Sequence, residues 1–136
     1  MDAKGYVEQV AAAARSAAAV LAVATGARRD AAILASASAI RRGKDDIQAA
    51  NEKDLARSDQ FDLTEAMVDR LRLTDERIED MASTLEQIAA QVDPVGLTIA
   101  AYNRPNGLRI EKRRVPIGVV AIVFESRPNV TADAAG

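Results

Sequence analysis

The positions of the four prolines divide this chain into two parts that must fold differently. Proline lacks a backbone N–H and disrupts the interior of helices and central strands. Residues 1–93 contain no proline and are rich in Ala, Leu, Glu, Lys, Arg and Gln, which favour helices. The prolines occupy positions 94, 105, 116 and 128. The sequence therefore predicts a helical layer that ends near Asp93 and is followed by strands and turns.

Five helices are expected before Pro94, because apolar residues recur there at three- and four-residue spacing. They should span about 3–25, 30–42 and 44–57, a short stretch opened by 62–65, and a stretch opened by 74–76. Asp2 can accept hydrogen bonds from first-turn amides, and Gly26 is placed to end the first helix. Asp62-Leu63-Thr64-Glu65 resembles a capping box, and Thr74 with two carboxylates suits the positive end of the fifth helix dipole.

Two of these helices carry a clear apolar stripe, which we interpret as the contact face of a helical layer rather than a coiled-coil seam. The stripe residues are Ile33, Leu34, Ala37 and Ile40 in the second helix, and Ile78, Met81, Leu85, Ile88 and Val92 in the fifth. Between them, the polar run 51–54 has two interpretations, a solvated helix turn or a ligand site.

After Pro94 the apolar period changes to two, which is typical of strands. Alternation over 97–102 and 108–113 flanks Arg104-Pro105-Asn106-Gly107, a sequence suited to a tight turn with positive φ. The sequence therefore predicts a β-hairpin, which must lie against another surface because an isolated two-stranded ribbon is marginally stable.

The apolar run 117–124 predicts a strand buried on both faces. It ends in Glu125-Ser126-Arg127-Pro128-Asn129, which brings a carboxylate, a hydroxyl, a guanidinium and an amide together. Such a strand end could bind an anion or oxyanion. In the alternative structural interpretation, Asn129 or Thr131 caps a helix and Arg127 pairs with a nearby carboxylate.

Composition excludes several classes of function for these residues. The formal net charge is −2 and aromatic residues make up 3%, which argues against nucleic acid as a partner. Cys and His are absent, so disulfides, Cys/His metal sites, cysteine nucleophiles and imidazole catalysis are excluded, and we expect no metal. The apolar segment 10–27 is interrupted by Arg15 and Ser16, which argues against export or a membrane span.

Several segments together resemble the gamma-glutamyl phosphate reductase (glutamate-5-semialdehyde dehydrogenase) family of the aldehyde dehydrogenase superfamily. They are residues 50–54, the hairpin segment 104–111, and residues 114–136, which contain the motif Phe-Glu-Ser-Arg-Pro-Asn-Val. The resemblance covers most of the chain and implies the N-terminal portion of a longer α/β enzyme.

The resemblance implies a specific domain plan. Residues 1–93 would be N-terminal helices of a modified Rossmann cofactor domain, 94–115 an oligomerisation-type hairpin, and 116–136 the first buried strand and the start of the next helix. The hairpin would join copies of the protein into a homo-oligomer.

The resemblance also implies a reaction, the NADPH-dependent reduction of L-glutamyl 5-phosphate to L-glutamate 5-semialdehyde and phosphate in proline biosynthesis. A cysteine thioester forms in this family, but no cysteine lies in this chain, so we expect the 136 residues alone to be inactive. Carried over to this sequence, Asn129 is the oxyanion candidate, Arg127 the substrate-binding candidate, and Glu125 and Ser126 the cofactor-binding candidates.

The resemblance further implies a cytoplasmic enzyme without membrane contact, and it points to glutamate 5-kinase as a protein partner. Two alternatives remain open at this stage. One is a non-catalytic helical and β interaction module, and the other is a superfamily reductase that acts on a different acyl phosphate or aldehyde.

Overall fold

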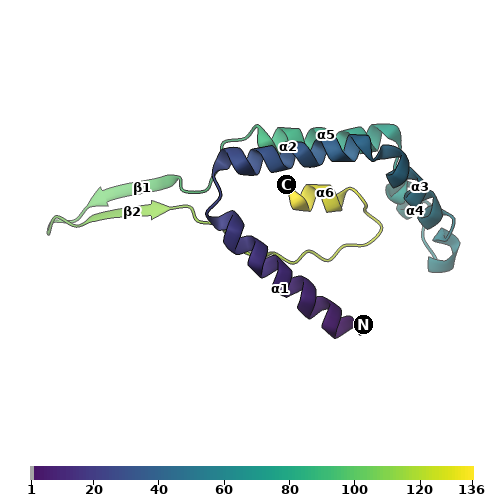
Figure 1. Ribbon diagram of the computed structural model, residues 1–136, viewed down its shortest axis with the longest axis horizontal. Coiled ribbons are helices and arrows are strands. Elements are labelled where there is room, and N and C mark those ends of the chain that lie inside the picture. The colour runs from purple at the N-terminus through teal and green to yellow at the C-terminus, as the bar shows by residue number, and fades with distance from the viewer. Residues whose placement is uncertain (1) are drawn as a thin grey trace. The chain divides into compact units, whose positions relative to one another are not determined.

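The computed structural model describes residues 2–136, and the order of its elements follows the predicted change from helices to a hairpin (Figure 1). The elements are α1 (Ala3–Ala22), α2 (Gly26–Arg42), α3 (Lys44–Leu55), the 3-10 turn η1 (Ser58–Phe61), α4 (Glu65–Leu71), α5 (Asp75–Ala89), β1 (Thr98–Asn103), β2 (Arg109–Arg113) and α6 (Val130–Ala135). They form two compact units. One contains the residues up to Arg29 and 92–121, and the other contains 30–91 and 122–136.

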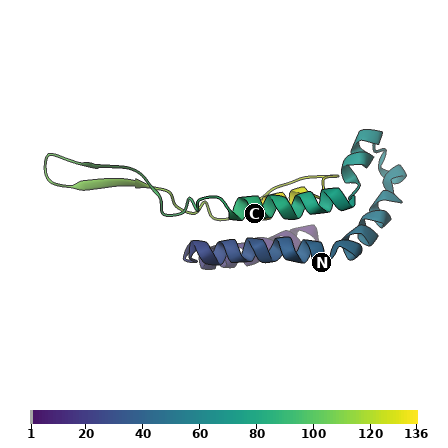
Figure 2. The same cartoon turned by 90° about the horizontal axis from the view of Figure 1, so that it is seen from above.

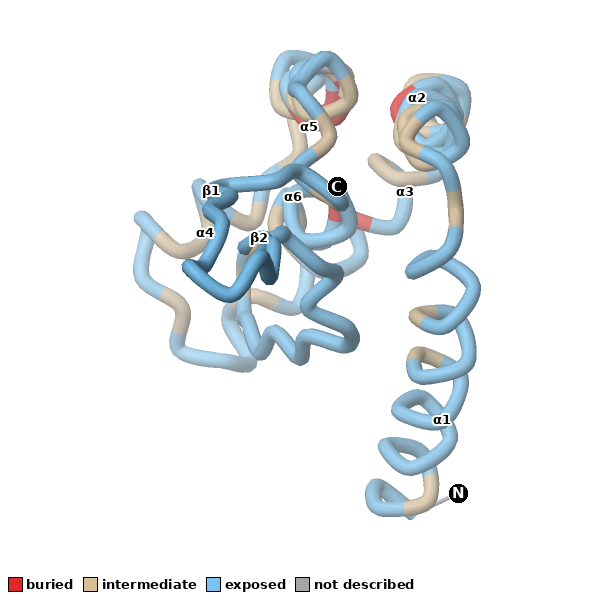
Figure 3. Tube along the Cα trace, turned by 90° about the vertical axis from the view of Figure 1, so that its left-hand side faces the viewer, coloured by how far each residue is buried: buried red, intermediate tan, exposed pale blue. Residues whose placement is uncertain are grey.

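The buried residues lie in the second unit, where α2 and α5 run side by side (Figures 2 and 3). Its core consists of Ala37 from α2, Met81, Ala82 and Leu85 from α5, and Ala132 from α6. The predicted stripes are therefore largely correct, although Leu34 is 45% exposed and Val92, beyond the end of α5, is 79% exposed.

The start of α5 was predicted correctly, and Thr74 accepts a hydrogen bond from the backbone N–H of Arg77 at 3.2 Å. The capping box at 62–65 was wrong in register. Thr64 caps α4 by accepting from the N–H of Met67 at 3.3 Å, while Asp62 has a left-handed backbone with φ of 48°. Asp62 therefore belongs to the preceding turn, and α3 ends at Leu55, before this turn begins.

The ion pairs between α2 and α5 predict an acid-sensitive helix contact. Arg41 binds Glu79 and Glu86 together, with 2.9 Å from Arg41 Nε to Glu79 Oε2 and from Arg41 Nη2 to Glu86 Oε2. Hydrogen bonds from Arg41 hold the pKa of both carboxyls below their ordinary value of about 4.5. Stability from this pair is therefore present at neutral pH and lost as the pH falls below about 4.5 through the folded pKa values.

We expect the urea midpoint of the protein to decrease as the pH is lowered from about 6 to about 3. The decrease should be smaller in an Arg41→Met variant. The variant removes the hydrogen bonds that are the main cause of the lowered pKa of both carboxyls. If the urea midpoint decreased equally with pH in the wild-type protein and the variant, this explanation would be wrong.

In the first unit, the junction between α1 and α2 is fixed by Arg29. Its guanidinium pairs with Asp93 and donates to the carbonyl oxygens of Ala24 at 2.5 Å and Leu21 at 3.3 Å. The hydrogen bond from Arg29, with a second from the N–H of Val95, lowers the pKa of Asp93. The predicted end of the first helix at Gly26 was wrong, because α1 ends at Ala22 and Gly26 begins α2.

Gly26 is required here because its Cα faces Asp93. A Cβ added at Gly26 would lie 2.7 Å from Asp93 Oδ2. We expect Gly26→Ala to lower the urea midpoint by displacing the carboxylate from Arg29. In an Asp93→Ala background the same change should be neutral or stabilising, because Ala favours a helix over Gly. The four midpoints of this double-mutant cycle test the contact, and equal effects of Gly26→Ala in both backgrounds would refute it.

The hairpin was predicted correctly. β1 and β2 pair antiparallel, with Tyr102 opposite Ile110, and the N–H of Arg104 donates to the carbonyl of Leu108 at 2.8 Å. Gly107 has φ of 85°, the positive value that the turn requires. All six residues of β1 are exposed.

The prediction of a buried strand over 117–124 was wrong for the chain that the structure describes. This segment forms no strand, and Ile117 and Val123 are 91% and 99% exposed. A strand needs the N–H and C=O groups of a neighbouring strand, and the only sheet among residues 2–136 is the two-stranded hairpin. No helix within these residues is both long and apolar enough to cross a bilayer.

Candidate functional site

The predicted site residues lie on the loop that leads into α6. Ser126 has a left-handed backbone with φ of 54°, which is uncommon for a residue other than glycine. The loop then closes into a turn, because the N–H of Val130 donates to the carbonyl of Arg127 at 3.1 Å. The core residue Ala132 anchors α6 and holds this turn beside α5.

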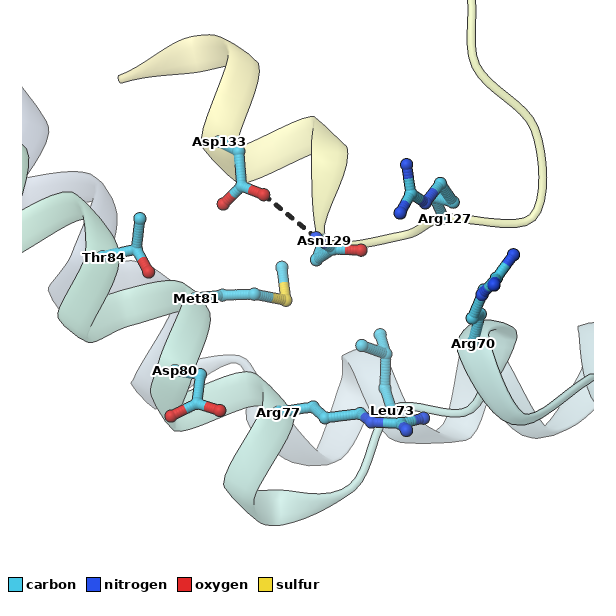
Figure 4. Close-up of a pocket in the computed structure, with 9 residues that line it drawn as sticks. All are labelled: Arg70, Leu73, Arg77, Asp80, Met81, Thr84, Arg127, Asn129 and Asp133. Atoms are coloured by element: carbon cyan, nitrogen blue, oxygen red, sulfur yellow. Dashed lines mark hydrogen bonds between the residues drawn. The ribbon is translucent and has the colours of Figure 1, made fainter. Parts of the chain in front are cut away.

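Arg127 and Asn129 line one pocket of about 290 Å³, formed by this loop, α4 and α5 (Figure 4). Its other lining residues are Arg70, Leu73, Arg77, Asp80, Met81, Thr84 and Asp133. The two predicted residues therefore share one cavity, with charged groups from a distant part of the sequence. The volume is near the lower limit of small-molecule sites.

Asn129 has one amide donor engaged. Its Nδ2 donates to Asp133 Oδ2 at 3.0 Å, a bond along one turn of α6 (Figure 4). An amide NH₂ group has two donors, so the second N–H remains available for a ligand oxygen. Asn129 is the N-cap residue of α6, as the structural alternative expected, but its side chain forms no cap hydrogen bond with the helix.

The arginines of the pocket differ in their partners. Arg77 is held by Asp69, at 2.8 Å from Nη2 to Oδ2, and donates to the carbonyl of Arg72 at 2.9 Å. The side chain of Arg127 forms no hydrogen bond or ion pair with any residue in 2–136, so the carboxylate pairing of the structural alternative is absent from the described chain. The same holds for Arg70.

Glu125 and Ser126 line a different pocket. It has a volume of about 260 Å³, and its other lining residues are Asp54, Arg57, Phe61, Leu63 and Leu71. The four predicted residues are therefore divided between two cavities, Arg127 and Asn129 in one and Glu125 and Ser126 in the other. The division follows from the turn of the backbone at Ser126.

Sequence reasoning missed the charged residues of α4 and α5 in the first pocket. Arg77, Asp80 and Thr84 recur at helical spacing, so a polar face opposite the apolar stripe was visible in principle. Arg70 had no such signal, because only the fold brings α4 next to a loop more than fifty residues later.

Asn51 is a structural residue that supports this pocket. Its side chain is buried, at 6% exposure, and it donates to the carbonyl of Leu71 and accepts from the N–H of Leu73, both at 2.8 Å. It thereby ties α3 to the connection between α4 and α5. For Asn51, both the solvated and the ligand-binding interpretations of the polar run 51–54 were wrong, since both donor and acceptor bind backbone.

Known proteins resemble this chain in sequence over most of its length. No protein-family model matches the chain. The chain is 43% identical over 129 residues to a gamma-glutamyl phosphate reductase of Desulforapulum autotrophicum, covering 95% of this chain and 31% of the relative. It is 50% identical over 128 residues to the protein of the same name from Parvibaculum lavamentivorans, covering 94% and 30%.

Two solved structures agree with these relatives. The crystal structure of gamma-glutamyl phosphate reductase from Thermotoga maritima matches with a TM-score of 0.84 and 39% identity, covering 89% of this chain and 29% of that one. The enzyme from Saccharomyces cerevisiae matches with a TM-score of 0.85 and 31% identity, covering 93% and 32%. The helices and antiparallel hairpin thus have the architecture of the N-terminal region of these enzymes.

This agreement in sequence and in fold extends over nearly all of the chain. The chain spans about a third of the length of the relatives that it matches. It is therefore a homologue of the N-terminal part of gamma-glutamyl phosphate reductases.

Proposed function

We propose that this chain forms the N-terminal part of an NADPH-dependent reductase that converts L-glutamyl 5-phosphate to L-glutamate 5-semialdehyde and phosphate in proline biosynthesis. The observation that carries the proposal is the 43% identity to a reductase of this name over 95% of the chain. The shared pocket of Arg127 and Asn129 supports it, because an acyl phosphate needs both a cation and an oxyanion donor.

In the proposed reaction, a cysteine thiolate outside these residues attacks the acyl carbon and phosphate leaves, forming a thioester. NADPH, when bound, would supply a hydride to the thioester carbon, and cleavage of the C–S bond would then release the aldehyde and regenerate the thiolate. Asn129 donates its free N–H to the carbonyl oxygen, which gains negative charge at each attack, and Arg127 binds the departing phosphate. The chain itself contains no cysteine, so it supplies one wall of the site without the nucleophile.

The second pocket is the proposed contact with the cofactor. This pocket contains the hydroxyl of Ser126, the guanidinium of Arg57 and the carboxylate of Glu125. These polar groups fit the phosphate and ribose groups of a dinucleotide. A volume of about 260 Å³ accommodates only one portion of such a molecule. Glu125 and Ser126 would therefore hold that portion, next to but separate from the substrate pocket.

The hairpin is proposed to join copies of the protein into a homo-oligomer. Every residue of β1 is exposed, including Ile99 at 53% and Tyr102 at 52%, and both outer strand edges are unpaired within residues 2–136. An exposed edge of this kind pairs readily with another strand. The domain boundaries at 93 and 115 and the partnership with glutamate 5-kinase remain predictions.

The test uses the complete protein that contains these residues, assayed for NADPH oxidation with L-glutamyl 5-phosphate and with a panel of other acyl phosphates and aldehydes. We expect turnover with glutamyl phosphate and none with the 136 residues alone. A preference for another acyl phosphate would favour a different reductase of the superfamily. Absence of any reductase activity, with a folded protein, would favour the interaction module.

A further inference from the structure

The pocket of Arg127 and Asn129 carries opposite charges on opposite sides. Figure 4 shows Arg70 and Arg127 on one side, the carboxylates of Asp80 and Asp133 on the other, and Met81 between them. Asp133 accepts a hydrogen bond from Asn129 through Oδ2. A ligand in the pocket would therefore meet two guanidinium groups at one end and carboxylates at the other, of which that of Asp80 has no partner among residues 2–136.

Arg70 is an exposed residue whose side chain has no partner among residues 2–136. It lies in the last turn of α4, next to Leu71, whose carbonyl is held by Asn51 at 2.8 Å. Its side chain forms no hydrogen bond or ion pair with the residues that the structure describes, whereas nearby Arg77 is held by Asp69 and by the carbonyl of Arg72. A fixed backbone with an unengaged guanidinium is the arrangement expected of an anion ligand.

An anion that enters this end of the cavity can accept hydrogen bonds from both guanidinium groups. A phosphate suits this place better than a carboxylate, because it carries more charge and offers oxygens to both arginines. The carboxylate of Asp80 makes no hydrogen bond or ion pair within residues 2–136 and suits an ammonium group. Met81 gives the floor between the two ends an apolar surface.

We propose that this pocket orients an amino-acyl phosphate by its two charged ends. Arg70 joins Arg127 at the phosphate, and Asp80 binds the ammonium group at the other end of the aliphatic chain. This inference rests on the proposed function, and it deepens it by naming Arg70 and Asp80 as substrate-positioning residues. It also places the acyl carbon between the two ends, beside Asn129.

The reverse reaction separates the two ends, because inorganic phosphate and the amino aldehyde then bind as different substrates. The aldehyde, phosphate and NADP⁺ give the acyl phosphate, NADPH and a proton. In the complete enzyme we expect Arg70→Gln to raise the KM for phosphate about 10-fold to 100-fold and to leave the KM for the aldehyde within about twofold. Asp80→Asn should raise the KM for the aldehyde and leave that for phosphate unchanged.

Matched controls test whether general charge or folding explains the result. Arg72→Gln removes the same charge two residues from Arg70, and Glu76→Gln removes a carboxylate from the same helix as Asp80; neither residue lines the pocket. Both controls should leave the two KM values unchanged. Arg70→Lys should recover part of the phosphate affinity, because it restores the charge without the planar fork.

Calorimetric titration of the complete protein with inorganic phosphate provides a readout independent of activity. We expect Arg70→Gln to weaken this binding about 10-fold or more, with an unchanged melting temperature. If the wild-type protein has no reductase activity, the proposed function fails, and the titration still decides whether Arg70 binds phosphate. The proposed orientation would be overturned if an active Arg70→Gln variant kept the wild-type KM and affinity for phosphate. It would also be overturned if either variant changed the KM values of both substrates equally.

Discussion

The proposed oxyanion role predicts that replacing Asn129 by alanine in the complete protein lowers kcat about 10²-fold to 10³-fold, which corresponds to about 2.7–4 kcal/mol of transition-state stabilisation. The reason is that Asn129 has an N–H free of protein partners in a pocket shared with Arg127. An oxyanion donor acts mainly in the transition state, so the KM for the acyl phosphate should change much less than kcat. Steady-state kinetics at saturating NADPH measure both.

The control for this prediction is Asp133→Asn. Asn129 also binds Asp133 across one turn of α6, so an effect of Asn129→Ala could arise from loss of this bond. Asp133→Asn weakens the same bond and keeps the amide of Asn129 in place, so it should retain most of the activity. Equal losses in the two variants would assign Asn129 a structural role, and full turnover in Asn129→Ala would exclude the oxyanion role.

Replacing Asn51 by alanine should destabilise the fold strongly, because Asn51 is the one buried polar residue among residues 2–136. The change leaves the carbonyl of Leu71 and the N–H of Leu73 without their partners, both in a part-buried position. Each buried group left unsatisfied costs about 1–3 kcal/mol, so we expect the free energy of unfolding to fall by about 2–6 kcal/mol. Urea denaturation monitored by circular dichroism gives this value.

The neighbouring Glu52→Ala is the matched control, because Glu52 is exposed and should change the free energy of unfolding by less than about 0.5 kcal/mol. Asn51 also supports the connection that carries Arg70, so Asn51→Ala should weaken phosphate binding in protein that remains folded. If Asn51→Ala were as stable as Glu52→Ala, water would be satisfying both backbone groups, and the proposed structural role of Asn51 would be wrong.

Local signals predicted much of the helical part of the fold. Thr74 and the apolar stripe of α5 were sufficient to place that helix, because capping and helical periodicity involve residues within a few positions of one another. The turn at Gly107 was also predicted correctly from its local sequence. Local signals failed where two interpretations compete, as at 62–65, where Thr64 rather than Asp62 caps α4.

Long-range contacts could not be predicted in this way. The apolar run 117–124 has the composition of a buried strand, yet a strand is defined by partners elsewhere, and residues 2–136 provide none. The candidate site shows the same limit. Arg127 and Asn129 were found from their own segment, whereas Arg70 and Asp80 belong to the pocket only because α6 packs on α5.

Short stretches of sequence were enough to predict the helix-rich first part, the hairpin, and the family resemblance carried by the segments 50–54, 104–111 and 114–136. Each of these depends on the order and type of neighbouring residues. By contrast, packing between distant elements places Glu125 and Ser126 in one cavity and Arg127 and Asn129 in another, and it gives the cavity of Arg127 and Asn129 its charged ends. A cavity exists only where distant elements pack together, and its charge depends on which side chains that packing leaves unpaired.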